Sequence, residues 1–226
     1  MLSKRNIKII AAFISLILIV LAVFFFQRID EKVESQMIEN DRDLVRMSSQ
    51  EVLQLKTGDL IFRKGYGMVS QWVSTYLEHG PYDLTHVGIV MVRPSSVFVA
   101  HALSSKKMKV NGVIIQPLNE FLQASNPENI LVVRWKNYSS AMDSGLWSSV
   151  NTYVREKIPF DKEADYDDSS ALYCNEMIVK LWMNELGLID PPKNSIEKKY
   201  RFHNLSVLYE PSSTDIIFST FQRYDD

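Results

Sequence analysis

The longest hydrophobic stretch of the chain lies close to its N-terminus. From Ile9 to Phe26, 18 residues in a row are apolar with the single exception of Ser15. As a helix that rises about 1.5 Å per residue, this run would be roughly 27 Å long, close to the hydrocarbon thickness of a bilayer. A core helix of a globular domain keeps one polar side, and this run has none. The pattern therefore predicts one N-terminal transmembrane helix.

The charges on either side of this run predict its orientation. Three cations come before it: Lys4, Arg5 and Lys8. The charged residues between Arg28 and Glu34 sum to −1, so the positive-inside rule places the N-terminus in the cytoplasm. The run ends in bulky residues without a small-residue cleavage site, which favours an uncleaved signal anchor over a cleaved signal peptide.

These observations predict four regions along the chain. They are a cytoplasmic tail over 1–8, a signal anchor over 9–26, a solvated stalk or linker over 27–51 and a folded domain over 52–226. With the N-terminus inside, the domain is expected in the periplasm or another extracytoplasmic space. The protein would then be a single-pass membrane protein.

Within 52–226, short apolar runs precede a helical half. Strands are predicted over 60–62, 86–92, 97–102 and 130–135, with a further pair flanking Asn111-Gly112, a strong turn dipeptide. Helices are predicted from apolar spacings of three and four over 68–77, 117–124, 142–158 and 173–186. Strands that cluster before helices are typical of an α+β fold, here with one antiparallel sheet packed on helices.

Composition narrows the function classes. The chain has 25 Lys and Arg against 27 Asp and Glu, a net charge of −2, which argues against nucleic-acid binding. A single Cys excludes an internal disulfide and a zinc site built on several thiolates. The acidic segment 161–167 alternates like a calcium loop but has Tyr166 where an EF-hand needs Gly. No metal and no cofactor are expected.

The only cysteine, Cys174, is placed in the first turn of the helix predicted from about Tyr173. The positive end of a helix dipole lowers the pKa of a thiol and favours the nucleophilic thiolate. Asp168, Ser169 and Ser170 precede it as N-cap candidates. A buried structural cysteine fits this position equally well, so the helix alone leaves both interpretations open.

Two histidines lie at the outer ends of the predicted hairpin of strands 86–92 and 97–102. If Val92 pairs with Val97, opposite residues sum to 189, and His101 faces Gly88. Alternation then places His86 and His101 on the same face as diagonal neighbours, about 7–8 Å apart at the backbone. A slip of one residue would separate them, and two unrelated strand-end histidines are the alternative.

Cys174, His86 and His101 together would supply a nucleophile, a base and a group that orients the base. Backbone N–H groups at the start of the Cys174 helix, next to Asn175, could bind an oxyanion. Asp59 is a further candidate for the orienting position if His101 does not fill it. We therefore expect a catalytic site of Cys174, His86 and His101, with Asn175 and Asp59 around it.

Four segments resemble the YaeF/YiiX type of permuted papain-like amidases within the NlpC-like superfamily. In chain order they are Gly58–Phe62, Thr85–Val90, Gly112–Leu122 and Tyr173–Met177. The resemblance covers roughly Gly58 to Asn184. It implies a circularly permuted papain-like fold, with Cys174 as nucleophile and His86 as base.

The chain departs from the family pattern at two positions. His101 stands where this group often has Glu, as in the related lecithin retinol acyltransferases, and Asn175 replaces the common Ser after the Cys. A neutral His supports an imidazolium less than a carboxylate does. Neither change removes the nucleophile or the base.

The resemblance and the anchor together imply a membrane-anchored, extracytoplasmic cysteine hydrolase. It would cleave amide bonds, with cell-wall peptides as the expected substrates, through a thioester intermediate. One alternative is a lipid acyl hydrolase or acyltransferase that acts on amide or ester bonds. A second is a non-catalytic binding module that has kept the fold.

Overall fold

A computed structural model of the chain describes residues 4–76, 80–105 and 108–221. Its centre is one six-stranded sheet in which every neighbouring pair is antiparallel, in the order β4-β3-β2-β1-β5-β6. The strands are β1 (Leu60–Arg63), β2 (His86–Arg93), β3 (Ser96–Ser105), β4 (Val110–Pro117), β5 (Ile130–Trp135) and β6 (Thr214–Ser219). The predicted antiparallel sheet is confirmed, whereas β6 was not predicted.

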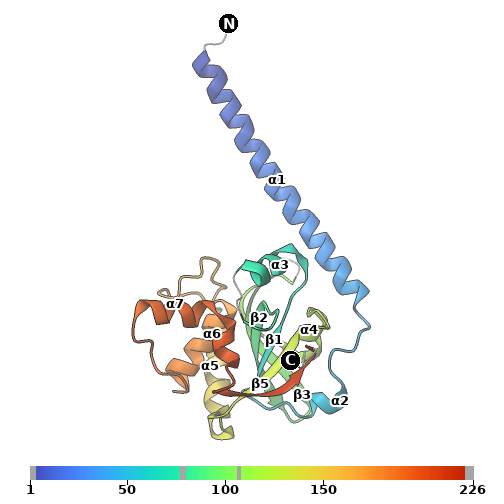
Figure 1. Cartoon of the computed structure of the whole chain (residues 1–226), viewed down its shortest axis with the longest axis vertical. Coiled ribbons are helices and arrows are strands. Elements are labelled where there is room, and N and C mark those ends of the chain that lie inside the picture. Colours follow the sequence, from blue (N-terminus) through green and yellow to red (C-terminus); the bar gives the residue numbers. More distant parts are fainter. Residues whose placement is uncertain (1–3, 77–79, 106–107, 222–226) are drawn as a thin grey trace.

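Helices cover both faces of this sheet (Figure 1). On one face lie α5 (Asp143–Arg155), α6 (Cys174–Lys180) and α7 (Ser195–His203), and α6 continues into a π-helical turn over Leu181–Glu185. The other face is covered by α4 (Leu118–Gln123). Short 3₁₀ turns occupy Ser140–Met142 and Leu205–Tyr209. The predicted α+β class is thus confirmed.

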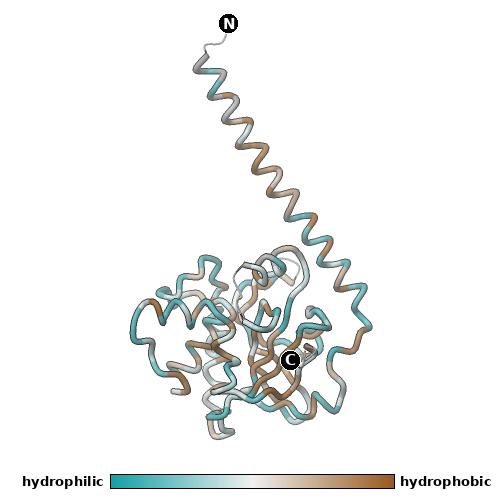
Figure 2. The backbone as a smooth tube through the Cα atoms, in the orientation of Figure 1, coloured by the Kyte–Doolittle hydropathy of each residue, from teal (hydrophilic) through white to brown (hydrophobic). Residues whose placement is uncertain are grey.

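Alternating strand residues divide the core into two apolar clusters. Val87 and Ile89 of β2 pack with the helical side, where Met177 and Trp182 are fully buried. Val90, from the same strand, packs with Val99 and Phe121 on the α4 side. Figure 2 shows the hydrophobic colour concentrated along these central strands. Both faces of β2 are therefore buried, which excludes water from most of its length.

The β2–β3 hairpin has the predicted register and a shorter loop. Val92 pairs with Val97 and Ile89 with Ala100, so opposite residues sum to 189 as predicted. Pairing continues to Arg93 and Ser96, which leaves Pro94 and Ser95 as the connection, instead of the predicted four-residue loop. The register places every side chain of the hairpin on its expected face.

Asn111-Gly112 does not form the predicted turn. Both residues lie inside β4, paired with Ser104 and Leu103 of β3. Gly112 has φ +142°, and a Cβ there would collide with the carbonyl oxygen of Ile158, the residue that accepts the N–H of Val113. The glycine thus serves the close approach of the chain after α5, which local turn statistics cannot reveal.

The N-terminal helix α1 (Lys4–Asn40) runs past the predicted anchor and into the predicted stalk. It is the helix, among the described residues, that is long and apolar enough to cross a membrane. Its last turns contact the domain: Asp30 Oδ1 accepts the N–H of Met68, 2.6 Å away, at the start of α3 (Gly67–Tyr76). The part of the predicted stalk around Asp30 is therefore docked on the domain rather than freely solvated.

The chain between α1 and β1 also belongs to the folded domain. Arg46 is buried and donates from Nε to the carbonyl oxygen of Ser125, 3.1 Å away, after α4. Met47 is buried in the α4-side cluster, and α2 (Ser49–Val52) follows it. The folded part thus begins a few residues before the predicted boundary at 52.

Candidate active site

His86 and His101 meet on the α4 side of the sheet. His86 Nε2 lies 2.8 Å from His101 Nδ1, and the two rings are edge to face with centroids 5.0 Å apart. Gly88 makes this possible, because a Cβ at that position would collide with Val99 and lie 3.3 Å from the His101 Cβ. The diagonal contact expected from the hairpin register is present.

Burial keeps both imidazoles neutral. His101 is fully buried and His86 is 9% exposed. The Phe121 ring centroid lies 6.0 Å from that of His86 and 5.2 Å from that of His101. Desolvation, and then the positive charge of Arg63, lower the pKa of His86 well below its ordinary value and that of His101 to about 3. A neutral His86 has a free lone pair and can act as a base.

Cys174 is the first residue of α6 and lies beside the start of β2. The backbone N–H groups of Val87 and Asn175 point at its thiol, and Val87 directly follows His86 in the chain. The nucleophile candidate thus lies next to the strand that carries the base candidate. The N-cap of α6 is Tyr173, whose N–H donates to Glu176 Oε2 at 3.3 Å, so Asp168–Ser170 are not the cap that the sequence suggested.

The thiol is held in its neutral form. Burial raises the pKa of Cys174, and this effect outweighs the backbone N–H groups and the positive charge of Arg63, which lower it. The expectation that the helix dipole alone would favour a thiolate is therefore wrong in direction for the resting site. With the thiol and both imidazoles neutral, attack on a carbonyl carbon requires the thiol proton to move.

Arg63 belongs to the site, although no pattern in the sequence pointed to it. It pairs with His86 across β1 and β2, it is 7% exposed, and its guanidinium lies 4.9 Å from the Phe121 ring centroid. It donates to the carbonyl oxygen of Ala124, while its buried Nε has no hydrogen-bond partner within the described ranges. Burial lowers the pKa of Arg63 to about 10, which still leaves it a cation at neutral pH. The residue thus provides a fixed positive charge at the site.

Asn175 has a structural side chain. Its Nδ2 donates to the carbonyl oxygens of Phe202 (2.7 Å), Arg201 (3.1 Å) and Asn204 (3.3 Å), which ties α6 to the end of α7. The side chain is therefore not available to an oxyanion. The backbone N–H of Asn175, which points at the thiol, is the group that remains in that role.

Asp59 lies away from the histidines and does not fill the orienting position. Its two carboxylate oxygens accept from Arg134 Nε at 2.7 Å and Nη2 at 2.8 Å, and Oδ2 also accepts the N–H of Lys56. Its backbone carbonyl accepts the N–H of Val90, so it stands beside the middle of β2 and not beside His86. This carboxylate holds the chain before β1 in place.

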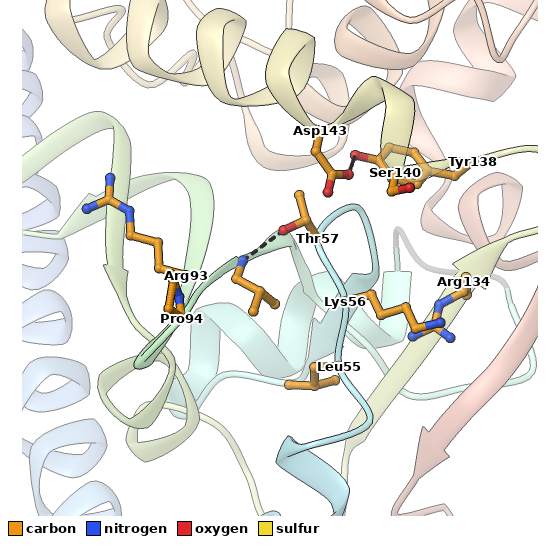
Figure 3. Close-up of a pocket in the computed structure, with 10 residues that line it drawn as sticks. Leu55, Lys56, Thr57, Arg93, Pro94, Arg134, Tyr138, Ser140 and Asp143 are labelled. Atoms are coloured by element: carbon orange, nitrogen blue, oxygen red, sulfur yellow. Dashed lines mark hydrogen bonds between the residues drawn. The ribbon is translucent and has the colours of Figure 1, made fainter.

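A cavity of about 560 Å³ opens at the far end of β2, around Val92 and Arg93 (Figure 3). Thr57 Oγ1 accepts the N–H of Val92 there, 3.0 Å away, and Tyr138 donates to Asp143 at 2.9 Å. His86 and Val92 are six residues apart on an extended strand, which corresponds to about 20 Å. The cavity is therefore separate from the Cys174 site.

The donor set does not suit a metal ion. Within the described ranges, no group of three or more His, Cys, Asp or Glu side chains could hold one. The chemistry available at the site is instead that of a thiol, a neutral imidazole paired with a second imidazole, and backbone N–H groups at a helix start. Such a set of groups is typical of acyl transfer through sulfur.

Comparisons with known proteins show the fold and the family of the chain. The fold resembles the crystal structure of the metalloprotein YiiX from Escherichia coli O157:H7, with a TM-score of 0.58 and 18% sequence identity over 75% of this chain and 99% of that one. No curated protein matches the chain. The model of the family described as permuted papain-like amidase enzyme, YaeF/YiiX, C92 family, matches residues 54–210. The chain therefore belongs to this family of permuted papain-like amidases and is a cysteine-type thiol hydrolase.

Proposed function

We propose that the protein is a membrane-anchored, extracytoplasmic amidase in which Cys174 is the nucleophile, His86 the base and His101 the group that orients His86. The observation that carries this proposal is the 2.8 Å contact between His86 Nε2 and His101 Nδ1 on the strand that also points a backbone N–H at the Cys174 thiol. Because His86 Nε2 is engaged by His101, its Nδ1 is the nitrogen left for the thiol proton.

The first chemical step forms a covalent bond between Sγ of Cys174 and the carbonyl carbon of the substrate amide. As sulfur attacks, the thiol proton passes to His86 Nδ1, and the carbonyl electron pair moves onto oxygen. The backbone N–H groups at the start of α6, with the Asn175 N–H among them, stabilise the oxyanion. Arg63 favours the negative charge on sulfur before the bond forms.

The second step breaks the C–N bond. The oxyanion collapses, His86 returns the proton to the departing amine, and a thioester on Cys174 remains. His86 then takes a proton from water, whose oxygen attacks the thioester carbonyl carbon. The C–S bond breaks, the acid leaves, and the proton returns to Sγ of Cys174. Each step uses one proton and one electron pair, so the cycle needs no cofactor.

The position of the anchor supports a substrate held close to the membrane. If the span ends near Phe26, four residues of helix, about 6 Å, separate it from Asp30, which is bonded to α3. The catalytic domain would then sit directly on the outer surface of the membrane. Peptide amides of the cell wall are the substrate class we propose, because family membership supports amide rather than lipid chemistry.

The substrate class can be tested with the full-length protein in detergent. We expect cell-wall muropeptides to gain new amino termini, measured by amine labelling and mass spectrometry, while phospholipids release no fatty acid. Fatty-acid release without new amines would instead support a lipid acyl hydrolase. Failure to cleave either substrate class would support a non-catalytic binding module.

The orientation of the anchor makes a separate prediction. With Lys4, Arg5 and Lys8 held inside, protease added to intact spheroplasts should remove the domain that follows Phe26. A cytoplasmic marker protein should survive in the same sample. If the domain is digested only after lysis, the orientation is the reverse, and if it is released without protease, the anchor is cleaved.

A further inference from the structure

Two buried polar atoms near the histidine pair have no hydrogen-bond partner among the residues that the structure describes. They are Nε2 of His101 and Oε1 of Gln116. His101 is fully buried and Gln116 is 6% exposed. A buried polar atom without a partner destabilises the fold, so a donor and an acceptor left unpaired in one place indicate that they belong together.

The strand order places these two atoms on the same side of the sheet. Gln116 of β4 pairs with Val99 of β3, and Ile114 pairs with His101. Opposite residues share a face, so Gln116 and His101 are diagonal neighbours, close enough for a long side chain to span the gap. Because β3 lies between β2 and β4, His101 has His86 on one flank and Gln116 on the other.

The orientation of the His101 ring agrees with a contact to Gln116 on β4. Its Nδ1 faces His86 of β2, so its Nε2 is the nitrogen left for β4. The nearby Gln116 side chain raises the pKa of His101, the direction expected of an acceptor, against the larger lowering by burial and by Arg63. The charged and titratable groups that act on the pair are Arg63 from β1 and the two rings themselves, and Cys174 from α6 acts on Arg63. None of these can accept the Nε2 proton of His101 from the β4 side.

We propose that Gln116 is a positioning residue that sets the tautomers of both histidines. Its Oε1 accepts the Nε2–H of His101, which leaves the His101 Nδ1 lone pair to accept the Nε2–H of His86. His86 is thereby held with its Nδ1 unprotonated and directed to the thiol of Cys174. The Gln116 amide thus fixes the position of the proton on His101, and through His101 the position of the proton on His86.

This inference rests on the proposed function for its consequence in catalysis, but not for its geometry. A neutral third residue has an ambiguity that a carboxylate lacks, because His101 could either donate to or accept from His86. If His101 donated from Nδ1, the His86 proton would sit on the nitrogen facing the thiol, and His86 could not act as a base. An acceptor at Gln116 removes that ambiguity.

The test is the tautomer of each histidine in the full-length protein in detergent, labelled with ¹⁵N-histidine and observed by long-range ¹H–¹⁵N NMR. The chain has four histidines, so the signals can be assigned by single substitutions. We expect the wild type to show Nε2–H tautomers at both His86 and His101. An Nδ1–H tautomer at His101 in the wild type would overturn the proposal without any variant.

Substitutions extend the test to the thiol. Gln116→Leu removes the acceptor and should mix the His101 tautomers and slow the alkylation of Cys174 by iodoacetamide about tenfold, the worth of one hydrogen bond. Gln116→Glu keeps an acceptor oxygen and should restore the wild-type tautomers. Ile114→Leu is the matched control, because it places Leu on the same face of β4 and leaves Gln116 intact.

Two outcomes separate this proposal from the proposed function. If Gln116→Leu leaves both tautomers unchanged, Gln116 has no positioning role, even if the enzyme still depends on Cys174. If the tautomers respond as expected but Cys174→Ala still hydrolyses amides, the positioning role stands and the nucleophile assignment fails.

Discussion

Replacing Cys174 with Ala should abolish amide hydrolysis, a loss greater than about 10³-fold, because backbone N–H groups and His86 offer no covalent route without sulfur. Cys174→Ser should also lose nearly all turnover, since a hydroxyl is much harder to deprotonate than a thiol. The measurement is release of new amino termini from a cell-wall peptide, with far-ultraviolet circular dichroism to confirm folding.

The same variants test for the thioester. Wild-type protein quenched with acid during turnover should carry the mass of the acyl group on the peptide that contains Cys174, and Cys174→Ala should carry none. An acyl adduct elsewhere in the chain, or full activity of Cys174→Ala, would disprove the nucleophile assignment.

The histidine pair could be predicted because it depends on local rules. A hairpin register follows from the loop position, and side-chain alternation then places His86 and His101 together. The predicted loop is two residues longer than the observed one. The predicted register is still correct, because Val92 lies opposite Val97 in the predicted and in the observed hairpin. Cys174 was predicted at a helix start for a similar reason, since the apolar spacing of α6 defines its phase.

Other parts of the site depend on contacts between segments that are distant in the chain. The periodicity of hydrophobic residues does not predict such contacts. Arg63 ends a short strand and would ordinarily be read as a surface charge, but β1 occupies the centre of the sheet beside β2 and α4 covers that face. Gly112 was read as a turn residue because Asn-Gly favours turns, whereas its role is to admit Ile158. In both cases the reason lies in which segments pack together, which single-sequence patterns do not specify.

The raised pKa of Cys174 has a measurable consequence for the free enzyme. Burial outweighs Arg63 and the helix N-terminus, so alkylation of the thiol should have its midpoint above about 8.5, the value for a free cysteine. The position of Cys174 at a helix start would by itself predict a midpoint below that value, and burial reverses this expectation. A midpoint well below 8.5 would instead indicate a thiolate paired with a protonated His86.

Replacing His86 with Ala should reduce turnover by about 10²–10⁴-fold, since it removes the base for attack and the acid for the leaving amine. His101→Ala should cost less, because His86 remains but loses the partner at 2.8 Å that fixes its ring. His101→Asn or His101→Gln should recover part of the activity by restoring an acceptor. The double change at His86 and His101 should match His86→Ala alone, because His101 acts through His86.

The pH dependence of stability gives a readout of this pair that does not involve a substrate. In the folded protein burial lowers the pKa of His101 to about 3, whereas an unfolded histidine titrates near 6.5. The unfolded chain therefore binds more protons between these values, so the free energy of unfolding falls as pH falls below about 6.5. His101→Ala removes one such group, and its denaturant midpoint should fall less steeply between pH 6.5 and 4 than that of the wild type. An unchanged slope would show that His101 is solvated and charged at acid pH, which is incompatible with a neutral ring accepting the His86 proton.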